Sequence, residues 1–243
     1  MKVSVIIPAA GLGTRMSRPA VAAGQTAPPP GRKQFLQLDG ESILAHTVRK
    51  FMTAPSVSEV VIAVRPEDRE WARELLAQVD KPKPLRFADG GDSRQQSVEN
   101  ALAILDDDTD LVAVHDAVRP FVSVATIERV IAEAAASGAA IVGVVPVDTV
   151  KQVHLSHIRS TIPRERLILA QTPQVFRFDL LRQAFDRARA DQFTGTDESS
   201  LVERLDQVEV TVVPGSDRNI KITKPADLEL ARLYLAREKA EQQ

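Results

Sequence analysis

The chain has 243 residues and 44% of them are hydrophobic, so it can bury a full core within the size of one domain. Its 31 Lys and Arg residues nearly balance its 33 Asp and Glu residues, which excludes a net field that would attract nucleic acid or an anionic membrane. It contains no cysteine, which excludes disulfides, thiolate catalysis and thiolate metal sites.

The amino-terminal segment, MKVSVIIPAA, carries one basic residue and an apolar stretch that is too short for a secretory signal. No later apolar run approaches the length needed to span a membrane. We therefore expect a cytoplasmic protein without nucleic-acid or membrane partners.

Short apolar segments rich in β-branched residues alternate along the chain with longer segments of helical period. The predicted strands are residues 3–7, 60–64, 111–114, 140–145 and 208–213, and the predicted helices are residues 43–52, 67–76, 97–105, 126–136, 179–188 and 226–236. This alternation is typical of an α/β fold with a mostly parallel sheet and helices on both of its faces. Pro225 suits the first turn of the last helix, where its missing N–H costs nothing.

Two segments interrupt the alternation. Residues 17–32 hold several prolines and glycines, which predict a mobile loop with a stiff polyproline stretch near its end. Residues 147–167 are too polar for a central strand and too rich in β-branched residues for a helix, so they predict a β-hairpin arm.

A glycine-containing turn, PAAGLGTRM, follows the first predicted strand, at the edge of the sheet where open α/β folds bind ligands. Gly11 and Gly13 would let backbone amides approach a phosphate, and Arg15 adds a positive charge, although a plain tight turn is the alternative. A dinucleotide fingerprint would need a small residue in place of Met16 and an acidic residue in the region that supplies Lys33. A P-loop string is also absent, so the pattern suits a nucleoside triphosphate attacked at its α-phosphorus.

Two further positions carry polar residues beside predicted elements. Gly91 and Asp92 precede a predicted helix, where they could cap it or accept the exocyclic amino group of cytosine. Asp116 follows the predicted strand 111–114, where it could hold a ribose or a magnesium ion bound to phosphates, with helix capping as the alternative.

Eight strings occur in order between residues 8 and 223: PAAGLGTRM, KQF, GGDSRQQSV, HDAVRPFV, VDTVK, QTPQVF, TDESSLVE and NIKIT. Together they resemble the methylerythritol phosphate cytidylyltransferases over nearly the whole chain. The resemblance implies a Rossmann-like, three-layer nucleotidyltransferase fold. It also implies a single domain at 1–243, within which residues 147–167 form a dimerisation and substrate arm.

The resemblance implies that the chain transfers the cytidylyl group of CTP to 2-C-methyl-D-erythritol 4-phosphate, with Mg²⁺ or another divalent cation. The products would be 4-diphosphocytidyl-2-C-methyl-D-erythritol, an isoprenoid precursor, and pyrophosphate. The nearest alternative is a cytidylyltransferase of the same fold that acts on ribitol 5-phosphate. A nicotinamide-dependent oxidoreductase and a nucleotide-binding regulatory protein without turnover are alternatives of other classes.

The patterns and the resemblance together give three groups of candidate site residues. The catalytic candidates are Arg15, Lys33, Arg164 and Lys221. The CTP-binding candidates are Ala9, Ala10, Gly11, Gly13, Gly91, Asp92, Ser97 and Asp116, and Asp116 is also the candidate metal ligand. The acceptor-binding candidates are Asp116, Arg119, Thr149, Arg164, Thr172, Thr196 and Lys221.

The resemblance also implies a homodimer. In the family the arm interlocks with its twin, so Arg164 is expected to reach the acceptor phosphate in the neighbouring subunit. The chain departs from the family between Arg15 and Lys33, where the family has a much shorter connection. The alignment of Lys33 therefore depends on the KQF string.

Overall fold

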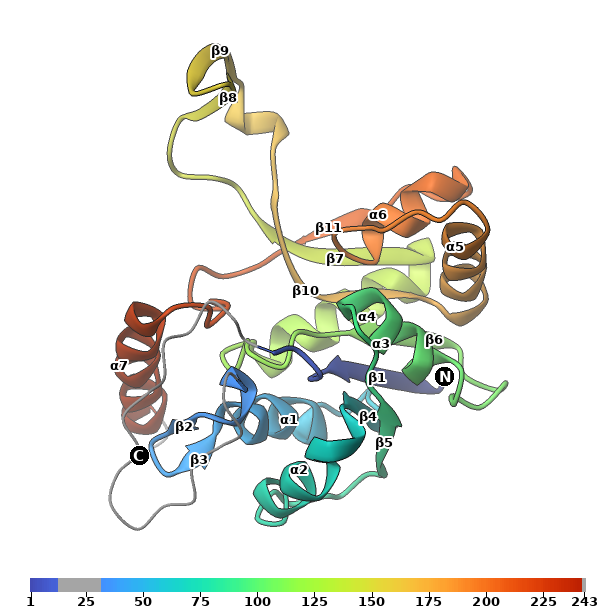
Figure 1. Ribbon diagram of the computed structural model, residues 1–243, viewed down its shortest axis with the longest axis vertical. Coiled ribbons are helices and arrows are strands. Elements are labelled where there is room, and N and C mark those ends of the chain that lie inside the picture. The colour runs from blue at the N-terminus through green and yellow to red at the C-terminus, as the bar shows by residue number, and fades with distance from the viewer. Residues whose placement is uncertain (13–31, 242–243) are drawn as a thin grey trace.

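The computed structural model describes residues 1–12 and 32–241. These residues contain a central sheet of seven strands (Figure 1). The strand order is β11–β7–β10–β6–β1–β4–β5. The strands are β1 (Val3–Pro8), β4 (Glu59–Val64), β5 (Leu85–Asp89), β6 (Leu111–Val114), β7 (Ala139–Val144), β10 (Leu169–Arg177) and β11 (Thr211–Pro214). Strand β10 runs antiparallel to β6 and β7, and the other neighbouring pairs are parallel.

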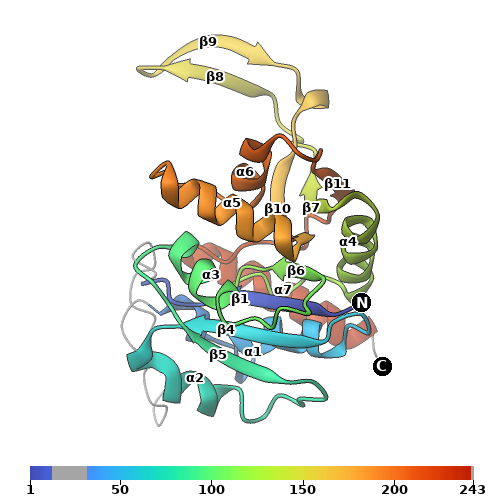
Figure 2. The ribbon, with the colours of Figure 1, turned by 90° about the vertical axis from the view of Figure 1, so that its right-hand side faces the viewer.

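Helices cover both faces of this sheet, as Figure 2 shows. Helices α1 (Ile43–Thr53), α2 (Arg69–Leu75) and α4 (Val124–Ser137) pack on one face, and α3 (Arg94–Leu102), α5 (Phe178–Ala190) and α6 (Ser199–Val202) pack on the other. Side chains alternate between the faces along a strand, so Val5 and Ile7 enter one core while Ile6 enters the other. The predicted three-layer α/β fold with a mostly parallel sheet is confirmed.

Serine caps explain where three of these helices begin. The hydroxyl groups of Ser42, Ser93 and Ser123 each accept the backbone N–H three residues further on, at the starts of α1, α3 and α4. The cap at Ser93 places the start of α3 three residues before the predicted start of that helix. Helix α4 ends at Ser137 and is capped by Gly138, whose φ of 90° favours glycine.

The last helix, α7 (Pro225–Glu241), begins at Pro225 as predicted and builds a third, smaller core. It packs near the short strands β2 (Gln37–Leu38) and β3 (Glu41–Ser42), which follow the 3₁₀ helix at Lys33–Phe35. Leu38 and Ile222 lie in this core. The chain segments after Lys33 and around Lys221 are therefore held against the same small core.

The predicted arm is confirmed as a hairpin. Strands β8 (Val150–His154) and β9 (His157–Ile162) form a separate two-stranded sheet that projects away from the main sheet in Figures 1 and 2. Leu155 and Ser156 connect them, with φ values of 45° and 65°. A 3₁₀ helix at Arg164–Arg166 follows. Several apolar side chains of the arm face solvent, including Leu155 at 80% exposure.

The predictions were wrong or incomplete at several elements. Strands β5 and β10 were not predicted, and the predicted strand 208–213 begins only at Thr211. The predicted helix 67–76 is divided into a 3₁₀ helix at Pro66–Asp68 and α2; another short 3₁₀ helix lies at Glu203–Leu205. The predicted loop 17–32 lies outside the described residues except for Arg32. Within the described residues, every helix is too short or too polar to traverse a lipid bilayer.

Candidate active site

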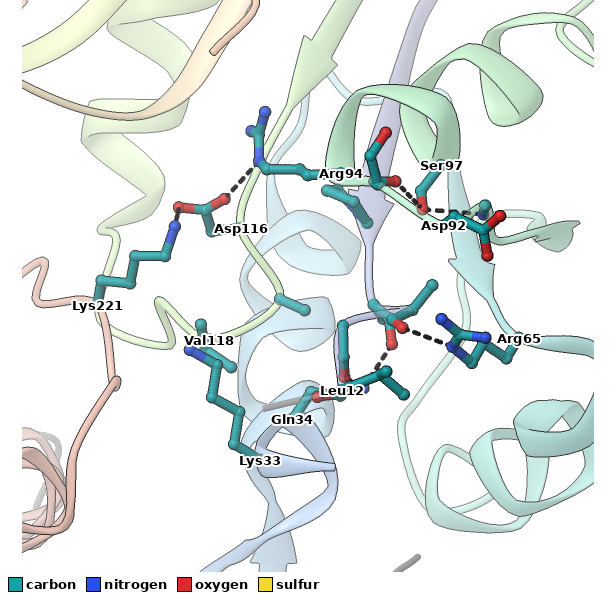
Figure 3. Close-up of a pocket in the computed structure, with 17 residues that line it drawn as sticks. Leu12, Lys33, Gln34, Arg65, Asp92, Arg94, Ser97, Asp116, Val118 and Lys221 are labelled. Carbon is teal, nitrogen blue, oxygen red and sulfur yellow. Dashed lines mark hydrogen bonds and ion pairs between the residues drawn. The ribbon is translucent and has the colours of Figure 1, made fainter. Parts of the chain in front are cut away.

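A cavity of about 330 Å³ opens where the carboxyl ends of β1, β4 and β6 meet. Figure 3 shows that its walls come from the turn after β1, the segment leading into α3 and the segment after β6. Lys33 and Lys221 add side chains from two distant parts of the chain. Open α/β sheets bind ligands at this position.

The turn after β1 forms one wall of the cavity and is fixed by side chains from outside it. The amide of Gln34 donates to the Ala9 carbonyl at 2.5 Å, and the Nε of Arg65 donates to the Ala10 carbonyl at 3.1 Å. Among the residues that the structure describes, a Cβ atom on Gly11 would meet no atom within 4 Å, so no described residue crowds the turn there. The wall can therefore admit a ligand close to the backbone.

The segment leading into α3 forms the opposite wall. A Cβ atom on Gly90 would lie 2.2 Å from the Cβ of Ala10, so glycine is needed for the two walls to approach each other. The Gly91 N–H donates to the Ser97 hydroxyl at 3.0 Å, and Ser97 itself is 2% exposed. The Asp92 side chain is exposed at the cavity (Figure 3). This wall presents backbone and carboxylate groups that suit the edge of a nucleobase.

Asp116, after β6, lies among cationic side chains. Its Oδ1 lies 3.1 Å from the Nε of Arg94, and its Oδ2 lies 2.9 Å from Lys221 and 3.3 Å from the Nε of Arg119. Burial alone would raise the pKa of Asp116, but Arg94, Lys221 and Arg119 together hold that pKa well below its usual range. Asp116 is therefore ionised at neutral pH.

A chain of hydrogen bonds through Thr172 and His115 holds the backbone of Asp116 in place. The Asp116 N–H donates to the Thr172 hydroxyl at 3.1 Å, Thr172 lies 3.1 Å from the Nδ1 of His115, and the Nε2 of His115 lies 3.0 Å from the Arg119 carbonyl. A carbonyl can only accept, so this network assigns the proton to Nε2 and makes Nδ1 the acceptor for the Thr172 hydroxyl. Burial lowers the pKa of His115 to about 4, so the ring is neutral.

Comparisons with known proteins identify the family. The family model described as 2-C-methyl-D-erythritol 4-phosphate cytidylyltransferase matches residues 3–237. The chain belongs to this family. Two relatives carry the same name: one from Solibacter usitatus is 60% identical, with 99% of this chain and 98% of the relative covered, and one from Acidobacterium capsulatum is 53% identical, with 97% and 98% covered.

Solved structures agree with this assignment. The crystal structure of 2-C-methyl-D-erythritol 4-phosphate cytidylyltransferase from Thermus thermophilus has a TM-score of 0.75 and 35% identity, with 98% of this chain and 100% of that chain covered. That of 4-diphosphocytidyl-2C-methyl-D-erythritol synthase from Anaerococcus prevotii has a TM-score of 0.83 and 29% identity, with 97% and 96% covered. None of these relatives is named for ribitol 5-phosphate, so that alternative is not favoured.

Most of the cytidylyltransferase residues predicted from the sequence lie around one cavity. Those that line it are Ala9, Ala10, Gly11, Lys33, Gly91, Asp92, Ser97, Asp116 and Lys221. Arg119 lies behind them, where its guanidinium contacts Asp116 and donates to the Asn219 carbonyl at 2.7 Å. Gly13 and Arg15 lie outside the described residues, so their roles stay predictions.

Four other candidates do not line this cavity. Thr149 and Arg164 lie on the arm, where the guanidinium of Arg164 donates to the Val147 carbonyl. Thr196 is exposed near the start of α6. Thr172 is 4% exposed and its hydroxyl is bonded within the protein, so in this structure it supports Asp116. Contacts between these four residues and a substrate stay predictions.

Sequence reasoning missed several residues at the site. Gln34 and Arg94 were inside the family strings but were assigned no role, and both line the cavity. Arg65 also lines it, and its only signal was its position directly after a predicted strand. Glu198, in the string TDESSLVE, is 1% exposed and pairs with Arg94 at 2.7 Å.

Proposed function

We propose that this cytidylyltransferase transfers the cytidylyl group of CTP to 2-C-methyl-D-erythritol 4-phosphate, as a step in isoprenoid precursor synthesis. One observation carries the proposal: Lys33, Lys221 and the ionised Asp116 border a single cavity of about 330 Å³ beside a glycine turn. Two phosphorylated substrates must be brought together for this reaction, and cations gathered from distant segments can hold both.

CTP would lie between the two walls of the cavity. The backbone around Gly91, Asp92 and Ser97 would bind the cytosine, since an acceptor there distinguishes its amino group from the carbonyl of uracil. The triphosphate would follow the turn at residues 9–12 toward Lys33. Asp116 would face the ribose from the end of β6.

An oxygen of the acceptor 4-phosphate would attack the α-phosphorus of CTP in line. A new O–P bond would form as the bond between the α-phosphorus and the bridging oxygen of the leaving pyrophosphate breaks. The attacking group is already an anion, so no general base is needed. Arg15 and Lys33 would stabilise the charge that grows on the phosphorus, and Lys221 and Arg164 would hold the acceptor phosphate.

Magnesium is the divalent cation that we expect with CTP. The described residues contain no group of three His, Asp or Glu side chains that could hold a metal on its own. Asp116 is the carboxylate in the right place, but both of its oxygens already accept from cations. Mg²⁺ usually takes one or two protein carboxylates and otherwise phosphate and water. These residues therefore fit an ion carried mainly by the triphosphate, with at most one oxygen from Asp116, and its charge would help to neutralise the phosphates.

We also propose a cytoplasmic homodimer formed through the arm at 147–167. The arm exposes Val147, Val153, Leu155 and Ile158 by 60% or more, an apolar surface that a second copy would cover. Thr149 and Arg164 on that arm would then complete the acceptor site of the neighbouring subunit. A dimer of this kind explains why the arm carries candidate site residues away from the cavity of its own chain.

The test is pyrophosphate release with CTP and Mg²⁺ in the presence of 2-C-methyl-D-erythritol 4-phosphate, ribitol 5-phosphate or buffer. We expect release with the first acceptor, and UTP in place of CTP should lower the rate. Release with ribitol 5-phosphate alone would refute the substrate. Absence of release with every acceptor would refute catalysis itself.

A further inference from the structure

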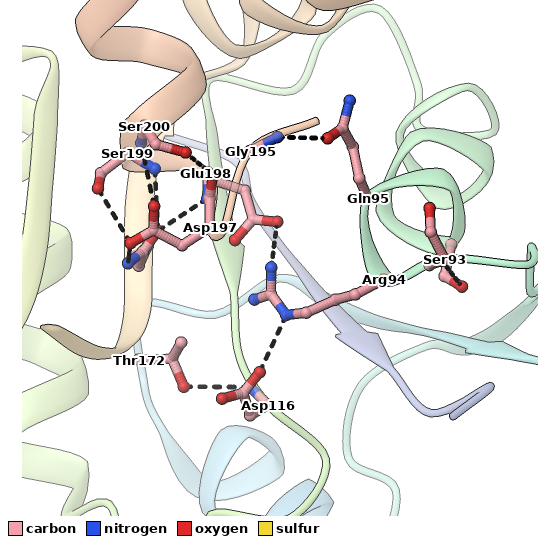
Figure 4. A network of polar contacts seen from close by, with 12 residues as sticks. Ser93, Arg94, Gln95, Asp116, Thr172, Gly195, Asp197, Glu198, Ser199 and Ser200 are labelled. Carbon is pink, nitrogen blue, oxygen red and sulfur yellow. Dashed lines mark hydrogen bonds and ion pairs between the residues drawn. The ribbon is translucent and has the colours of Figure 1, made fainter. Parts of the chain in front are cut away.

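Arg94 bridges two buried carboxylates at the back of the cavity, as Figure 4 shows. It is the first residue of α3, and its Nε lies 3.1 Å from the Oδ1 of Asp116. Its Nη1 lies 2.7 Å from the Oε1 of Glu198, which precedes α6. The Arg94 guanidinium, at the start of α3, thus connects the residue after β6 with the residue before α6.

The two carboxylates differ in their surroundings. The Asp116 side chain is 8% exposed and also contacts Lys221 and Arg119, whereas the Glu198 side chain is 2% exposed. Burial raises the pKa of Glu198, and Arg94 opposes that rise. Within the described part of the chain, the other oxygen of Glu198 is buried without a hydrogen-bond partner. The bond to Arg94 is therefore the side-chain contact that stabilises the charge of this buried glutamate.

The contacts of Asp116 are divided between its two oxygens. Lys221 and Arg119 both contact Oδ2, whereas the side-chain contact found for Oδ1 among the described residues comes from Arg94. If Lys221 is to hold an acceptor phosphate, its ammonium group must either leave Asp116 or contact the carboxylate and the phosphate at the same time. Arg94, on Oδ1, would then keep the Asp116 carboxylate in its orientation while Lys221 moves away from Oδ2.

We infer that Arg94 is a positioning residue, anchored by the buried Glu198, that holds Asp116 in place while Lys221 turns to the acceptor phosphate. The inference rests on the proposed function, because it assigns Lys221 to that phosphate. A planar, permanently charged fork suits this task, since it can bond two carboxylates at once, whereas a lysine ammonium cannot reproduce that geometry.

The experiment compares steady-state pyrophosphate release by wild type, Arg94→Gln, Arg94→Lys, Glu198→Gln and Asp116→Asn, each with its thermal unfolding midpoint. We expect Arg94→Gln to lower kcat by about tenfold to a hundredfold, as misplacement of a site group does. Arg94→Lys should not restore the rate. Glu198→Gln, which keeps its shape and loses its charge, should lower kcat less than Arg94→Gln.

The decisive comparison is Arg94→Gln in the Asp116→Asn background. If Arg94 acts through Asp116, adding Arg94→Gln to Asp116→Asn should lower kcat little further, because the ion pair between the two residues is already lost. An equally large loss in both backgrounds would overturn the inference and make Arg94 a direct substrate contact.

Arg86→Gln is the matched control, because Arg86 pairs with another buried glutamate, Glu59, at 3.1 Å and lies outside the cavity lining. It should lower the unfolding midpoint and leave kcat unchanged. If Arg94→Gln and Glu198→Gln behave like this control, the bridge only stabilises the fold and the inference is wrong. An inactive wild type would overturn the proposed function itself, a result distinct from an active wild type with unaffected variants.

Discussion

In the proposed mechanism, the acceptor phosphate competes with Asp116 for Lys221, which pairs with that carboxylate in the structure. Its atoms lie 2.9 Å apart, and the lysine side chain is 38% exposed while the aspartate is 8% exposed. The lysine can thus reach incoming phosphate while the carboxylate stays in place.

Replacing Lys221 with Ala should lower kcat/KM for the acceptor by on the order of a hundredfold, because one donor to the attacking phosphate is lost. The dissociation constant of CTP should stay close to that of wild type. Initial rates at varied acceptor concentration, together with calorimetric titration of CTP, measure the two effects. Lys224→Ala, an exposed lysine outside the cavity lining, is the control and should leave both unchanged. A loss of CTP affinity without an acceptor effect would contradict this role.

Because His115 is buried and neutral, the unfolding free energy of the protein should depend on pH. The unfolded chain protonates this ring near pH 6.5, whereas the folded protein does so only near its lowered pKa of about 4. The stability linked to this group is therefore fully present above pH 6.5 and is lost as pH falls from 6.5 toward 4. Between pH 7.5 and 5 the wild type should lose about 2 kcal/mol more unfolding free energy than His115→Gln.

Urea unfolding of both proteins at the two pH values measures this difference. The second buried histidine, His46, is present in both proteins, so its own pH dependence cancels. Equal losses in the wild type and His115→Gln would show that the ring is not held neutral.

The serine cap of helix α3 is expected to affect both the stability of the fold and the binding of CTP. Ser93→Ala should lower the unfolding free energy by about 1 kcal/mol, because its hydroxyl accepts the Gln96 N–H. It should also raise KM for CTP, since the same segment lines the part of the cavity that is proposed to bind the cytosine. Ser123→Ala removes the equivalent cap of α4, outside the cavity lining, and should cost similar stability without changing KM. Equal KM values for Ser93→Ala and Ser123→Ala would show that the cap of α3 does not affect CTP binding.

The strands with continuous apolar runs could be predicted from the sequence to within one residue at either end, as β1, β4, β6 and β7 show. Strand β10 could not, because Pro173 interrupts it and because Gln171 and Gln174 resemble surface residues. Both glutamines are buried with partners that only tertiary structure supplies: Gln171 donates to the Ser216 carbonyl, and Gln174 accepts from backbone N–H groups at the start of α6.

The candidate site could be predicted where a family string carried it, as for Asp116 and Lys221. The partners of Arg94 could not be predicted, because they lie 22 and 104 positions away in the sequence. Arg65 reaches the cavity through a bond to a turn 55 positions earlier. Local patterns carry no signal for contacts of this kind.

The proposed dimer predicts that two inactive variants will complement each other when their subunits are mixed. Arg164→Ala would damage the arm that enters the neighbouring site, and Lys221→Ala would damage the cavity of its own chain. In a mixed dimer one site would combine an intact cavity with an intact arm. Random exchange of subunits should therefore restore about a quarter of the wild-type activity.

This recovery is measured by mixing the two purified variants, allowing exchange and following pyrophosphate release. Each variant alone, at the same total concentration, is the control. An unchanged low rate after exchange has been demonstrated by mass spectrometry would mean that Arg164 does not act across subunits.

In the proposed reaction the acceptor phosphate itself attacks the α-phosphorus of CTP, in a cavity lined by cations from distant parts of the chain. The most direct measurement uses acceptor labelled with ¹⁸O in its phosphate and follows the label by ³¹P NMR. We predict that the label stays in the diphosphate of the product, including its bridging oxygen, and that the released pyrophosphate contains none. Labelled pyrophosphate, or CMP formed from CTP while the acceptor is unchanged, would contradict direct attack by the acceptor phosphate.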